Sequence, residues 1–455
     1  MTCRARSSML IILDLRRYAL STLVNTLRQS DAPIPFEFLI NGSFLRTTLD
    51  EYLTTNGISS ETTLAIEYVR ASIPPRHLST LEHPDWVSAV DVLSSTSVVS
   101  EHESGVTPGH ERILSASYDG SLRVWNTSSQ ILAASSPAST VGYTSSLKAA
   151  RFVGSKHVAS GGYDRCLRIW KYIEDAHGFS ASLQPHIVLY GHKAMIEAIS
   201  VHPTSNRLLT ASADHSLGFW SSKKSDAPPA PPARIPSSTG YTVKRRKVGP
   251  AISVPQRGPL SSLTSHTDVV SDVIFHPEHR TVAYSTSWDH SLKTWDLPTS
   301  TCVDTRSTSD SLFSLTTLST LNLVAVGSSA RHITLIDPRA TATTVSAMTL
   351  RGHNNLVASL ASNPTNPFSL VSGSHDGTCR IWDVRSAQSQ KDGRVGRSTY
   401  VLERESATGR GKKEAGEGVK VFSVCWDQSV GIVSGSEDNM VQINKGDEAV
   451  EKNKD

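Results

Sequence analysis

Short runs of alternating apolar and polar residues recur along most of the chain, separated by residues that favour turns. One such run alternates Leu122 and Val124 with Arg123, which is the pattern of a half-buried β-strand. A helical pattern occurs near the start, where apolar residues are three and four positions apart at Leu20, Leu23, Val24 and Leu27. The patterning therefore predicts a mainly β protein with a small α+β region at its N-terminus.

Residues 1–72 predict a small α+β domain of the ubiquitin-like type. After the helix, "IPFEFLINGSFLR" predicts a hairpin about Asn41 and Gly42, because this pair suits a type I′ turn. "LDEYLTTNG" predicts a short helical turn, and "TLAIEYV" predicts a last strand with Leu64, Ile66 and Tyr68 on one face. A ubiquitin-like roll also needs an initial hairpin, for which "MTCRARSSMLIILDL" offers one strand at most. Because an unpaired sheet edge is a liability, a misplaced start or a missed exon is favoured over an incomplete fold.

The rest of the chain contains an internal repeat. The strong copies are "SASYDGSLRVW" at 115–125, "SGGYDRCLRIW" at 160–170, "TASADHSLGFW" at 210–220, "STSWDHSLKTW" at 285–295 and "SGSHDGTCRIW" at 372–382. In each strong copy an Asp stands six residues before a Trp. Weaker copies begin at Val326 and Ser434, so the chain contains seven units. The shorter intervals between the Trp positions of successive units are typical of the four-stranded WD40 repeat. We therefore predict a seven-bladed WD40 β-propeller over 76–446, closed by a strand at 76–82 that completes the last blade.

A Ser, an Asp, a Trp and an upstream His recur in these units. A carboxylate in the turn before a strand can accept N–H groups from the backbone and from His. The predicted structural residues are His83, Asp119, Trp125, Asp164, Trp170, His192, Asp214, Trp220, His266, Asp289, Trp295, His353, Asp376, Trp382 and Asp438. A Ser, His and Asp set could also indicate a hydrolase triad, but a nucleophile would occur once and this set recurs. The pattern favours a structural role.

Two inserts interrupt the repeat. Residues 221–262 predict a disordered basic insert between blades 3 and 4, because "DAPPAPPARIP" is rich in Pro and has no period. Its adjacent cations suit a nuclear import receptor, with a solvated basic loop as the alternative; they are Lys244, Arg245, Arg246 and Lys247. Residues 386–418 predict a flexible insert between blades 6 and 7. Direct contact with RNA is one reading of this insert, but a solvated loop is favoured, because the insert has no interleaved aromatic residues for base stacking.

Composition and motifs narrow the function. The net charge of +3 is too small to indicate nucleic-acid binding by itself. The five cysteines are widely spaced and form no CxxC pair, which favours a reducing compartment and no structural zinc. No apolar run is long enough to span a membrane, and the sequence contains no phosphate loop, metal-ligand cluster or nucleophile elbow. We expect a nuclear or cytosolic protein that is not an enzyme and needs no cofactor.

The combination of domains resembles a known family. The stretches "RRYALSTLVNTL", "PIPFEFLINGSFLRTTLDEYL", "GISSETTLAIEYVRA" and "DWVSAVDV" resemble the WD-repeat ribosome-biogenesis protein of the PeBoW complex, the WD-repeat-containing protein twelve type, in its fungal form. The resemblance covers nearly the whole chain and is specific in the first 92 residues. Notchless proteins share the N-terminal domain type, but their propeller has an additional blade and lacks a comparable basic insert.

This resemblance implies a non-catalytic assembly factor for the large (60S) ribosomal subunit and for pre-rRNA processing. In the family, the propeller docks on the block-of-proliferation protein, which holds pescadillo, on pre-60S particles of the nucleolus and nucleoplasm. The MIDAS domain of midasin, an AAA ATPase, binds the ubiquitin-like domain and pulls the subcomplex off the particle. The family's ligand for the MIDAS Mg²⁺ lies in the loop before the last strand of this domain and matches Glu61.

One alternative comes from a different class of protein. "IWDVR" at 381–385 matches the WDxR pattern by which some propellers dock on the adaptors of cullin-ring ligases, so the chain could be a substrate receptor of a cullin-ring ubiquitin ligase. Trp382 already has a role in blade packing, and Arg385 ends a strand, where a solvated cation is normal. Affinity purification would distinguish the two readings by the partners recovered.

Overall fold

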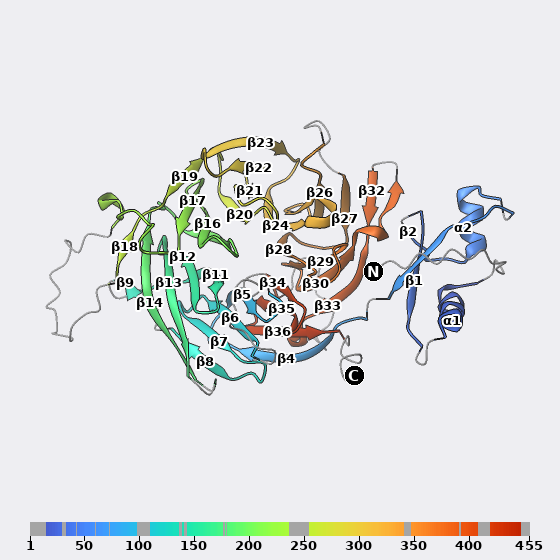
Figure 1. Cartoon of the computed structure of the whole chain (residues 1–455), viewed down its shortest axis with the longest axis horizontal. Coiled ribbons are helices and arrows are strands. Elements are labelled where there is room, and N and C mark those ends of the chain that lie inside the picture. Colours follow the sequence, from blue (N-terminus) through green and yellow to red (C-terminus); the bar gives the residue numbers. More distant parts are fainter. Residues whose placement is uncertain are drawn as a thin grey trace.

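A computed structural model describes residues 15–29, 33–41, 43–59, 61–71, 73–97, 110–135, 139–140, 143–175, 178, 180–235, 254–340, 347–390, 393–407 and 419–446. It consists of a ring of β-sheets and a small N-terminal domain beside the ring (Figure 1). The ring has seven blades, so the predicted fold class is confirmed: a mainly β chain, with a WD40 propeller preceded by a small α+β domain.

The N-terminal domain packs two helices on a three-stranded sheet. Its elements are α1 (Arg17–Arg28), β1 (Phe36–Ile40), β2 (Ser43–Phe44), α2 (Leu49–Asn56) and β3 (Ile66–Arg70). The strand order is β2-β1-β3, with β1 antiparallel to both neighbours. Phe36, Phe38 and Ile40 of β1 pack on Leu20 and Val24 of α1 in one apolar core. The initial hairpin in question would involve residues 1–14, which lie outside the described part of the chain.

The rotation of α1 differs from the sequence pattern. The predicted helix is present, but Leu27, one of the apolar residues at helical spacing, is 58% exposed and lies outside the apolar core of the domain. Polar residues bind the start of β1 instead: Ser21 Oγ accepts the Phe36 amide at 3.1 Å. Asn25 Nδ2 donates to the Ile34 carbonyl at 2.7 Å, and its Oδ1 accepts the Ile34 amide at 3.0 Å. These bonds satisfy backbone groups at the strand entrance and thereby set which face of α1 is buried.

Seven sheets form the propeller, and the four strands of each blade pair antiparallel. Blades 1 to 4 contain β5 (Val87–Leu93), β6 (Arg112–Ser117), β7 (Leu122–Trp125) and β8 (Ile131–Ala134); β11 (Leu147–Gly154), β12 (His157–Gly162), β13 (Cys166–Glu174) and β14 (Ala181–Tyr190); β15 (Ile196–Val201), β16 (Arg207–Ser212), β17 (Ser216–Ser221) and β19 (Ser261–Thr264); and β20 (Val270–Phe275), β21 (Val282–Ser287), β22 (Ser291–Asp296) and β23 (Thr301–Ser307). Blades 5 to 7 contain β24 (Leu312–Leu318), β25 (Leu323–Ser328), β26 (His332–Ile336) and β27 (Met348–Arg351); β28 (Val357–Ser362), β29 (Ser369–Ser374), β30 (Thr378–Asp383) and β33 (Ser398–Glu403); and β34 (Val421–Asp427), β35 (Gly431–Ser436), β36 (Met440–Lys445) and β4 (Arg76–Glu82). A small hairpin of β9 (Ser139–Thr140) and β10 (Tyr143–Thr144) lies between blades 1 and 2.

The ring is closed by strands from opposite ends of the chain. β4 pairs antiparallel with β36, with Glu82 opposite Met440 and Arg76 opposite Lys445. The strand expected at 76–82 is therefore the outer strand of blade 7 (Figure 1). Closure pairs β-strand edges that would otherwise be exposed.

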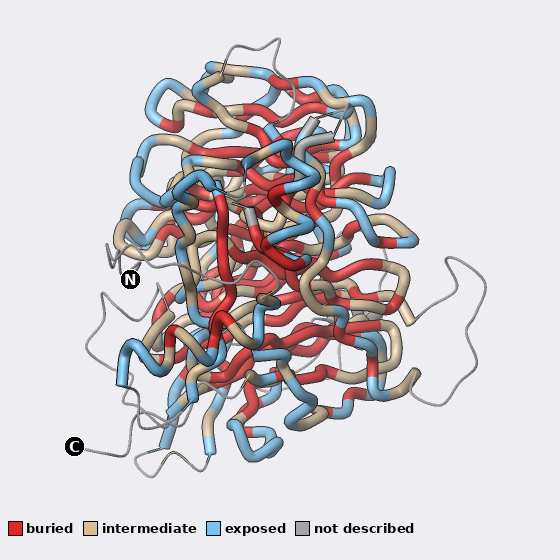
Figure 2. Tube along the Cα trace, turned by 90° about the vertical axis from the view of Figure 1, so that its right-hand side faces the viewer, coloured by how far each residue is buried: buried red, intermediate tan, exposed pale blue. Residues whose placement is uncertain are grey.

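Apolar clusters join each blade to its neighbour. Trp220 of blade 3 packs with Ile187 and Leu189 of blade 2, and Trp295 of blade 4 packs with Leu209 of blade 3. Figure 2 shows the same organisation as buried strands and more exposed turns. The Trp at the end of the third strand thus fills the space between two blades.

The first insert is placed differently from the prediction. Residues 221–262 lie inside blade 3, between its third strand β17 and its outer strand β19, and not between blades 3 and 4. Part of the insert is ordered: it contains η1 (Pro232–Arg234) and β18 (Gln256–Arg257), and β18 adds in parallel to the outer strand β14 of blade 2. The expectation of a wholly disordered insert is wrong because the edge of β14 offers free backbone groups to pair with. Residues 236–253, with the predicted import signal, lie outside the described part.

The second insert also contributes to the sheets. Residues 398–403 form β33, the outer strand of blade 6. β31 (Gln388–Gln390) and β32 (Gly393–Gly396) form a hairpin that pairs in parallel with β27 of blade 5. The prediction of a flexible insert between blades 6 and 7 is therefore wrong for these residues, whereas 408–418 lie outside the described part.

Side chains of the inner strands link the blades around the channel. In each case a carboxylate or hydroxyl oxygen accepts a backbone amide of another blade: Asp91 from Phe152 (2.8 Å), Ser200 from Phe275 (3.3 Å), Asp272 from Leu315 (2.9 Å), Ser359 from Val424 (3.0 Å) and Ser423 from Val90 (3.2 Å). Each bond satisfies a backbone amide that points toward the neighbouring blade and therefore takes no part in the strand pairing between the two sheets.

Candidate functional site

Glu61 lies in an exposed turn between α2 and β3. Helix α2 ends at Gly57, whose φ of 63° is left-handed and suits glycine. The Ser59 carbonyl accepts the Thr62 amide at 3.1 Å and Thr62 Oγ1 at 2.7 Å. The Glu61 amide donates to Ser59 Oγ at 3.3 Å. Local hydrogen bonds therefore order the backbone of the turn without using the Glu61 side chain.

The two carboxylates of this domain that differ most in environment are Glu61 and Glu37. Glu37 on β1 is 6% exposed and is neutralised by Arg17 at 3.1 Å and Arg46 at 3.6 Å. Glu61 is exposed, and among the described residues its carboxylate has neither an ion pair nor a hydrogen bond. A carboxylate in this state can supply an oxygen ligand to a hard cation held by another molecule.

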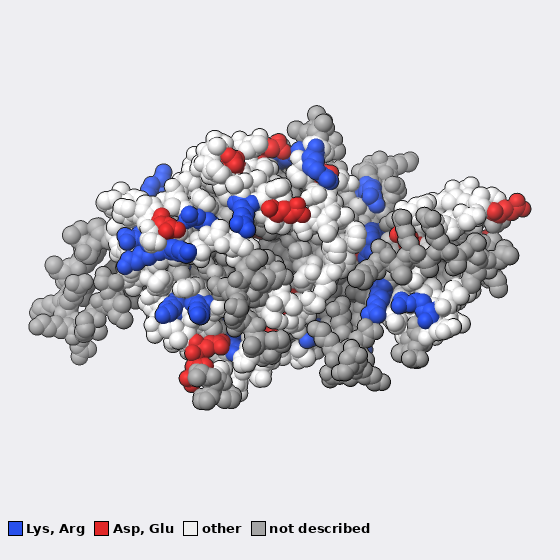
Figure 3. Space-filling view, in the orientation of Figure 1, with Lys and Arg blue, Asp and Glu red and all other residues white. Residues whose placement is uncertain are grey.

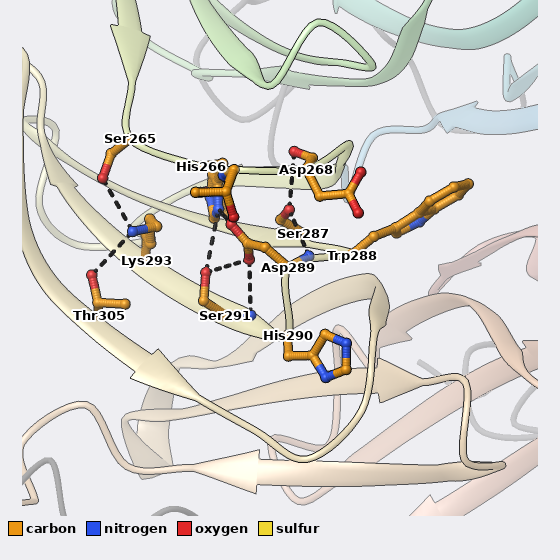
Figure 4. A network of polar contacts seen from close by, with 12 residues as sticks. Ser265, His266, Asp268, Ser287, Trp288, Asp289, His290, Ser291, Lys293 and Thr305 are labelled. Carbon is orange, nitrogen blue, oxygen red and sulfur yellow. Dashed lines mark hydrogen bonds and ion pairs between the residues drawn. The ribbon is translucent and has the colours of Figure 1, made fainter.

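The predicted His, Ser, Asp and Trp come together in blade 4. Figure 4 shows His266, Asp289 and Ser291 of this network. His266 Nδ1 lies 2.8 Å from Asp289 Oδ2, and its Nε2 lies 2.7 Å from Ser285 Oγ. Trp295 Nε1 donates to the same hydroxyl at 2.7 Å. Ser291 Oγ donates to Asp289 Oδ1 at 2.5 Å. Ser285 is 0% and Ser291 is 5% exposed, so a substrate could not reach either hydroxyl in this conformation.

The environment fixes the charges of this network. Burial alone would raise the pKa of Asp289, but hydrogen bonds from Ser291, the Thr267 amide and His266 outweigh it and lower the pKa to about 2. Burial lowers the pKa of His266, and the Asp289 carboxylate offsets only part of that effect. Asp289 is thus a buried carboxylate that accepts a hydrogen bond from the Nδ1–H group of a neutral imidazole.

Blades 3 and 6 contain the same arrangement. His353 lies 2.9 Å from Asp376 and 2.6 Å from Ser372, and Trp382 donates to Ser372 at 2.7 Å. In blade 3 the hydroxyl belongs to a Thr: the distances are His192 to Asp214 3.2 Å, His192 to Thr210 2.6 Å and Trp220 to Thr210 2.8 Å.

Blades 1 and 2 depart from this scheme. His83 Nε2 and Trp125 Nε1 lie 2.7 and 2.8 Å from Ser115 Oγ, but Asp119 bonds Arg123 at 2.6 Å instead of His83. In blade 2, Asp164 pairs with Arg168. Trp170 donates to Ser160 Oγ at 2.9 Å. The predicted link between His83 and Asp119 therefore does not hold in blade 1, because Arg123 reaches the carboxylate. No His was predicted for blade 2, where Arg168, also four residues after the Asp, takes the carboxylate.

Blade 7 uses an arginine in place of the histidine. Arg404 is 1% exposed and lies 2.9 Å from Asp438 Oδ1 and 3.1 Å from Oδ2. It also donates to Ser434 Oγ at 2.8 Å. Sequence reasoning missed Arg404, although it stands between the last two repeat units and the Asp at 438 lacks an upstream His.

Aromatic side chains gather at one end of the channel. Trp86, Tyr118 and Phe422 lie with ring centroids 5.8 to 6.1 Å apart. Tyr163 and Trp288 at the same mouth are 49% and 37% exposed, and Figure 4 shows Trp288 extending away from the Asp289 network. Partly exposed aromatic residues are enriched at protein interfaces. Sequence reasoning missed this surface, although the residue just before the repeat Asp is Tyr118, Tyr163, Trp288 or His375 in four blades.

A cavity of about 340 Å³ lies beneath these aromatic residues. Its charged lining includes Lys148, Arg151, Glu197 and Asp272. Arg151 pairs with Asp91 at 3.1 Å. Among the described residues, no group of three His, Cys, Asp or Glu could hold a metal ion, and no helix is long and apolar enough to cross a membrane.

Arg385 of the WDxR sequence is not a solvated cation, contrary to expectation. Its side chain is 17% exposed and bonds both oxygens of Asp383, at 3.0 and 2.6 Å. Its guanidinium carbon lies 4.6 Å from the ring centroid of Phe368 and 5.3 Å from that of Phe44. A ring of the N-terminal domain therefore covers the residue that an adaptor would need to reach.

Comparisons with known proteins agree with these features. The family model described as NLE (NUC135) domain matches residues 4–53, and the WD domain, G-beta repeat matches 75–126, 183–221, 257–296 and 345–383. Among solved structures, the WD40 propeller domain of Doa1 aligns with this chain at a TM-score of 0.55 and 19% sequence identity. The alignment covers 82% of this chain and 97% of the Doa1 domain, and it shows similarity of fold alone.

Full-length relatives are far more similar. The ribosome biogenesis protein ytm1 of Aspergillus clavatus is 59% identical over 96% of this chain and 91% of its own length. The protein of the same name from Ajellomyces capsulatus is 60% identical over 96% of this chain and 89% of its own length. Since this identity extends through both the N-terminal domain and the propeller, the chain belongs to the Ytm1 family of ribosome biogenesis proteins.

Proposed function

We propose that this chain is a non-catalytic assembly factor of the 60S subunit that binds a propeller partner and, through Glu61, the MIDAS domain of midasin. Membership of the Ytm1 family gives it a role in ribosome biogenesis. The proposal adds the partners, which are the block-of-proliferation protein, pescadillo and midasin on pre-60S particles. It also adds a nucleolar and nucleoplasmic location, with import through Lys244, Arg245, Arg246 and Lys247.

The observation that carries the midasin contact is the unpaired Glu61 carboxylate in an ordered turn. Mg²⁺ requires near-octahedral oxygen ligands at about 2.0–2.1 Å and tolerates little error in their position. A ligand offered from a turn whose backbone is already ordered loses less entropy on binding than one from a mobile loop. Among the described residues, no contact within the chain has to be broken to release the Glu61 side chain.

The propeller contact is supported by the aromatic mouth of the channel. Trp86, Tyr163 and Trp288 are each more than a third exposed, although they are large apolar side chains. Such residues supply much of the binding energy of protein interfaces. The ligase-receptor alternative has no comparable support, because Phe44 covers Arg385.

The test is binding of the full chain to the purified midasin MIDAS domain, measured by calorimetry with Mg²⁺ and with EDTA. Replacement Glu61→Ala should weaken binding by about 100-fold, as expected when one partner of a close charged contact is removed. Glu61→Asp should also fail, because its oxygen is withdrawn by about 1.5 Å, the length of one C–C bond. Glu67→Ala, which removes an exposed carboxylate on β3, is the matched control.

Binding that survives Glu61→Ala, or that is unchanged by EDTA, would contradict the role of Glu61. Particle release in cells carrying Glu61→Ala, scored by the amount of the protein retained on pre-60S particles, gives the functional readout. Retention should rise in Glu61→Ala and stay normal in Glu67→Ala.

A further inference from the structure

Two neighbouring blades carry the same Asp-x-Arg sequence after the third strand, but in different surroundings. In blade 5, Arg339 bonds both oxygens of Asp337, at 3.1 and 3.2 Å, and its side chain is 63% exposed. In blade 6, Arg385 bonds Asp383 in the same two-fold manner but is only 17% exposed. The motif itself therefore does not bury the arginine, and the difference arises from what packs over it.

The N-terminal domain supplies the cover. Phe44 belongs to β2, is 8% exposed and places its ring 5.3 Å from the Arg385 guanidinium carbon. Phe368 places its ring 4.6 Å from the same carbon. β2 packs on η3 (Val384–Ser386), and Figure 1 shows β2 next to blade 6 with α1 and α2 farther from the ring. A guanidinium held flat by a carboxylate is well suited to stack on aromatic faces.

A second contact supports the same docking. Tyr400 on β33 lies close enough to the N-terminal domain to interact electrostatically with Glu37, Arg17 and Arg46. All five residues of β1 are buried, although α1 covers only one face of that strand. In blade 6, η3 therefore packs on the sheet of the N-terminal domain, and Tyr400 of β33 lies within electrostatic range of it.

The connection between the domains favours this contact. Only the five residues 71–75 separate β3 from β4, and two of them are Pro74 and Pro75. Five residues span at most about 18 Å, and two prolines stiffen the segment. A short tether keeps the local concentration of one surface near the other at roughly the millimolar level, so a small interface is enough for docking.

We propose that Arg385 docks the N-terminal domain on blade 6, and that the WDxR sequence of this chain serves an intramolecular interface. Docking gives the N-terminal domain, and with it the Glu61 turn, a fixed orientation relative to the propeller. This inference does not depend on midasin binding. It assigns Arg385 as a positioning residue whose partner is the Phe44 surface of the same chain.

The test compares Arg385→Ala, Arg385→Lys and the matched control Arg339→Ala in the full chain, by small-angle scattering and amide hydrogen exchange. Arg385→Ala should increase the radius of gyration and should speed exchange in β2 and η3 by about tenfold, the factor expected from losing one stacking contact. Arg385→Lys keeps the charge but not the planar fork, so it should fall between wild type and Arg385→Ala. Arg339→Ala should match wild type.

Phe44→Ala tests the same contact from the other side and does not disturb the folding of blade 6. If Arg385→Ala also speeds exchange in β28–β30, blade 6 itself has loosened. The result for Phe44→Ala then decides whether the docking contact exists. Because the two side chains form one contact, the double variant should be no more open than either single variant. Scattering and β2 exchange that stay at the wild-type level in Phe44→Ala would overturn the proposal.

Discussion

Replacement of Arg404 by Ala should loosen the blade that closes the propeller. The Arg404 guanidinium bonds Asp438 and also donates to the Ser434 and Met440 carbonyls, at 3.2 and 2.8 Å. These acceptors lie on or next to β35 and β36, and β36 pairs with β4 from the other end of the chain. Arg404 itself directly follows β33 of blade 6. One side chain thus ties the end of blade 6 to the closing blade.

The loss of folding free energy expected for Arg404→Ala follows from the burial of its ion pair with Asp438. Arg404 is 1% exposed, and the Asp438 side chain is 8% exposed, so Arg404→Ala leaves a buried carboxylate without its cation. Breaking such a pair costs about 3–5 kcal/mol of folding free energy. Burial would raise the pKa of Asp438, whereas Arg404 lowers it below its ordinary value. Removal of the guanidinium should therefore raise this pKa.

Urea unfolding, followed by tryptophan fluorescence, measures the global effect, and amide exchange in β4 and β36 measures the local one. Arg339→Ala removes an arginine that is 63% exposed and should change stability by less than about 0.5 kcal/mol. The double variant Arg404→Met/Asp438→Leu should recover much of the loss, because an apolar pair can replace a buried ion pair. The reasoning is refuted if Arg404→Ala unfolds at the wild-type urea concentration, or if the double variant is as unstable as the sum of the single ones.

Two further predictions concern the blade networks and their packing. Burial, assisted by Arg123, lowers the pKa of His83 from 6.5 to about 4, so the unfolded chain binds a proton that the folded chain does not, and stability should fall as the pH falls. From pH 7 to pH 5 this residue should reduce the folding free energy by about 2 kcal/mol. The urea midpoint should therefore change less between these two pH values in His83→Gln than in wild type. An equal change in both proteins would contradict the lowered pKa of His83. Gly373→Ala would place a Cβ 2.5 Å from Val424 Cγ2 and 2.8 Å from Val421 Cγ1, between blades 6 and 7. It should cost about 1–3 kcal/mol, and a thermal midpoint equal to wild type would show that the valines give way freely.

The sequence was most informative where the signal is local and repeated. The Asp and Trp six residues apart, the alternation of strands such as 122–125 and the turn pair Asn41-Gly42 each reflect the backbone preferences of a few adjacent residues. Seven such units, and a strand left over at 76–82, were enough to predict the number of blades and the closure of the ring. The identity of Glu61 as a candidate ligand came from the family resemblance, and its exposure follows from a turn that is held by Ser59.

Predictions failed where a local pattern has two outcomes and a distant contact selects one. Composition indicated disorder in residues 221–262, but the free edge of β14 pairs with β18 from that insert. Spacing grouped Leu27 with Leu20 and Val24 on one helix, but Ser21 and Asn25 bind the start of β1 and Leu27 is exposed. Asp119 of blade 1 was expected to join a network with His83, but Arg123 reaches its carboxylate instead.

Only the tertiary structure decided which residues are exposed at the surface and which are covered by other parts of the chain. The aromatic mouth of the channel is assembled from turns of several blades, so no single segment displays it. Arg385 and Arg339 have the same local sequence pattern, but the rings of Phe368 and Phe44 pack against Arg385, whereas Arg339 is 63% exposed. Periodicity along a chain specifies strands and blades because those interactions are local, whereas a surface or a docking contact depends on residues that become neighbours only when the ring has closed.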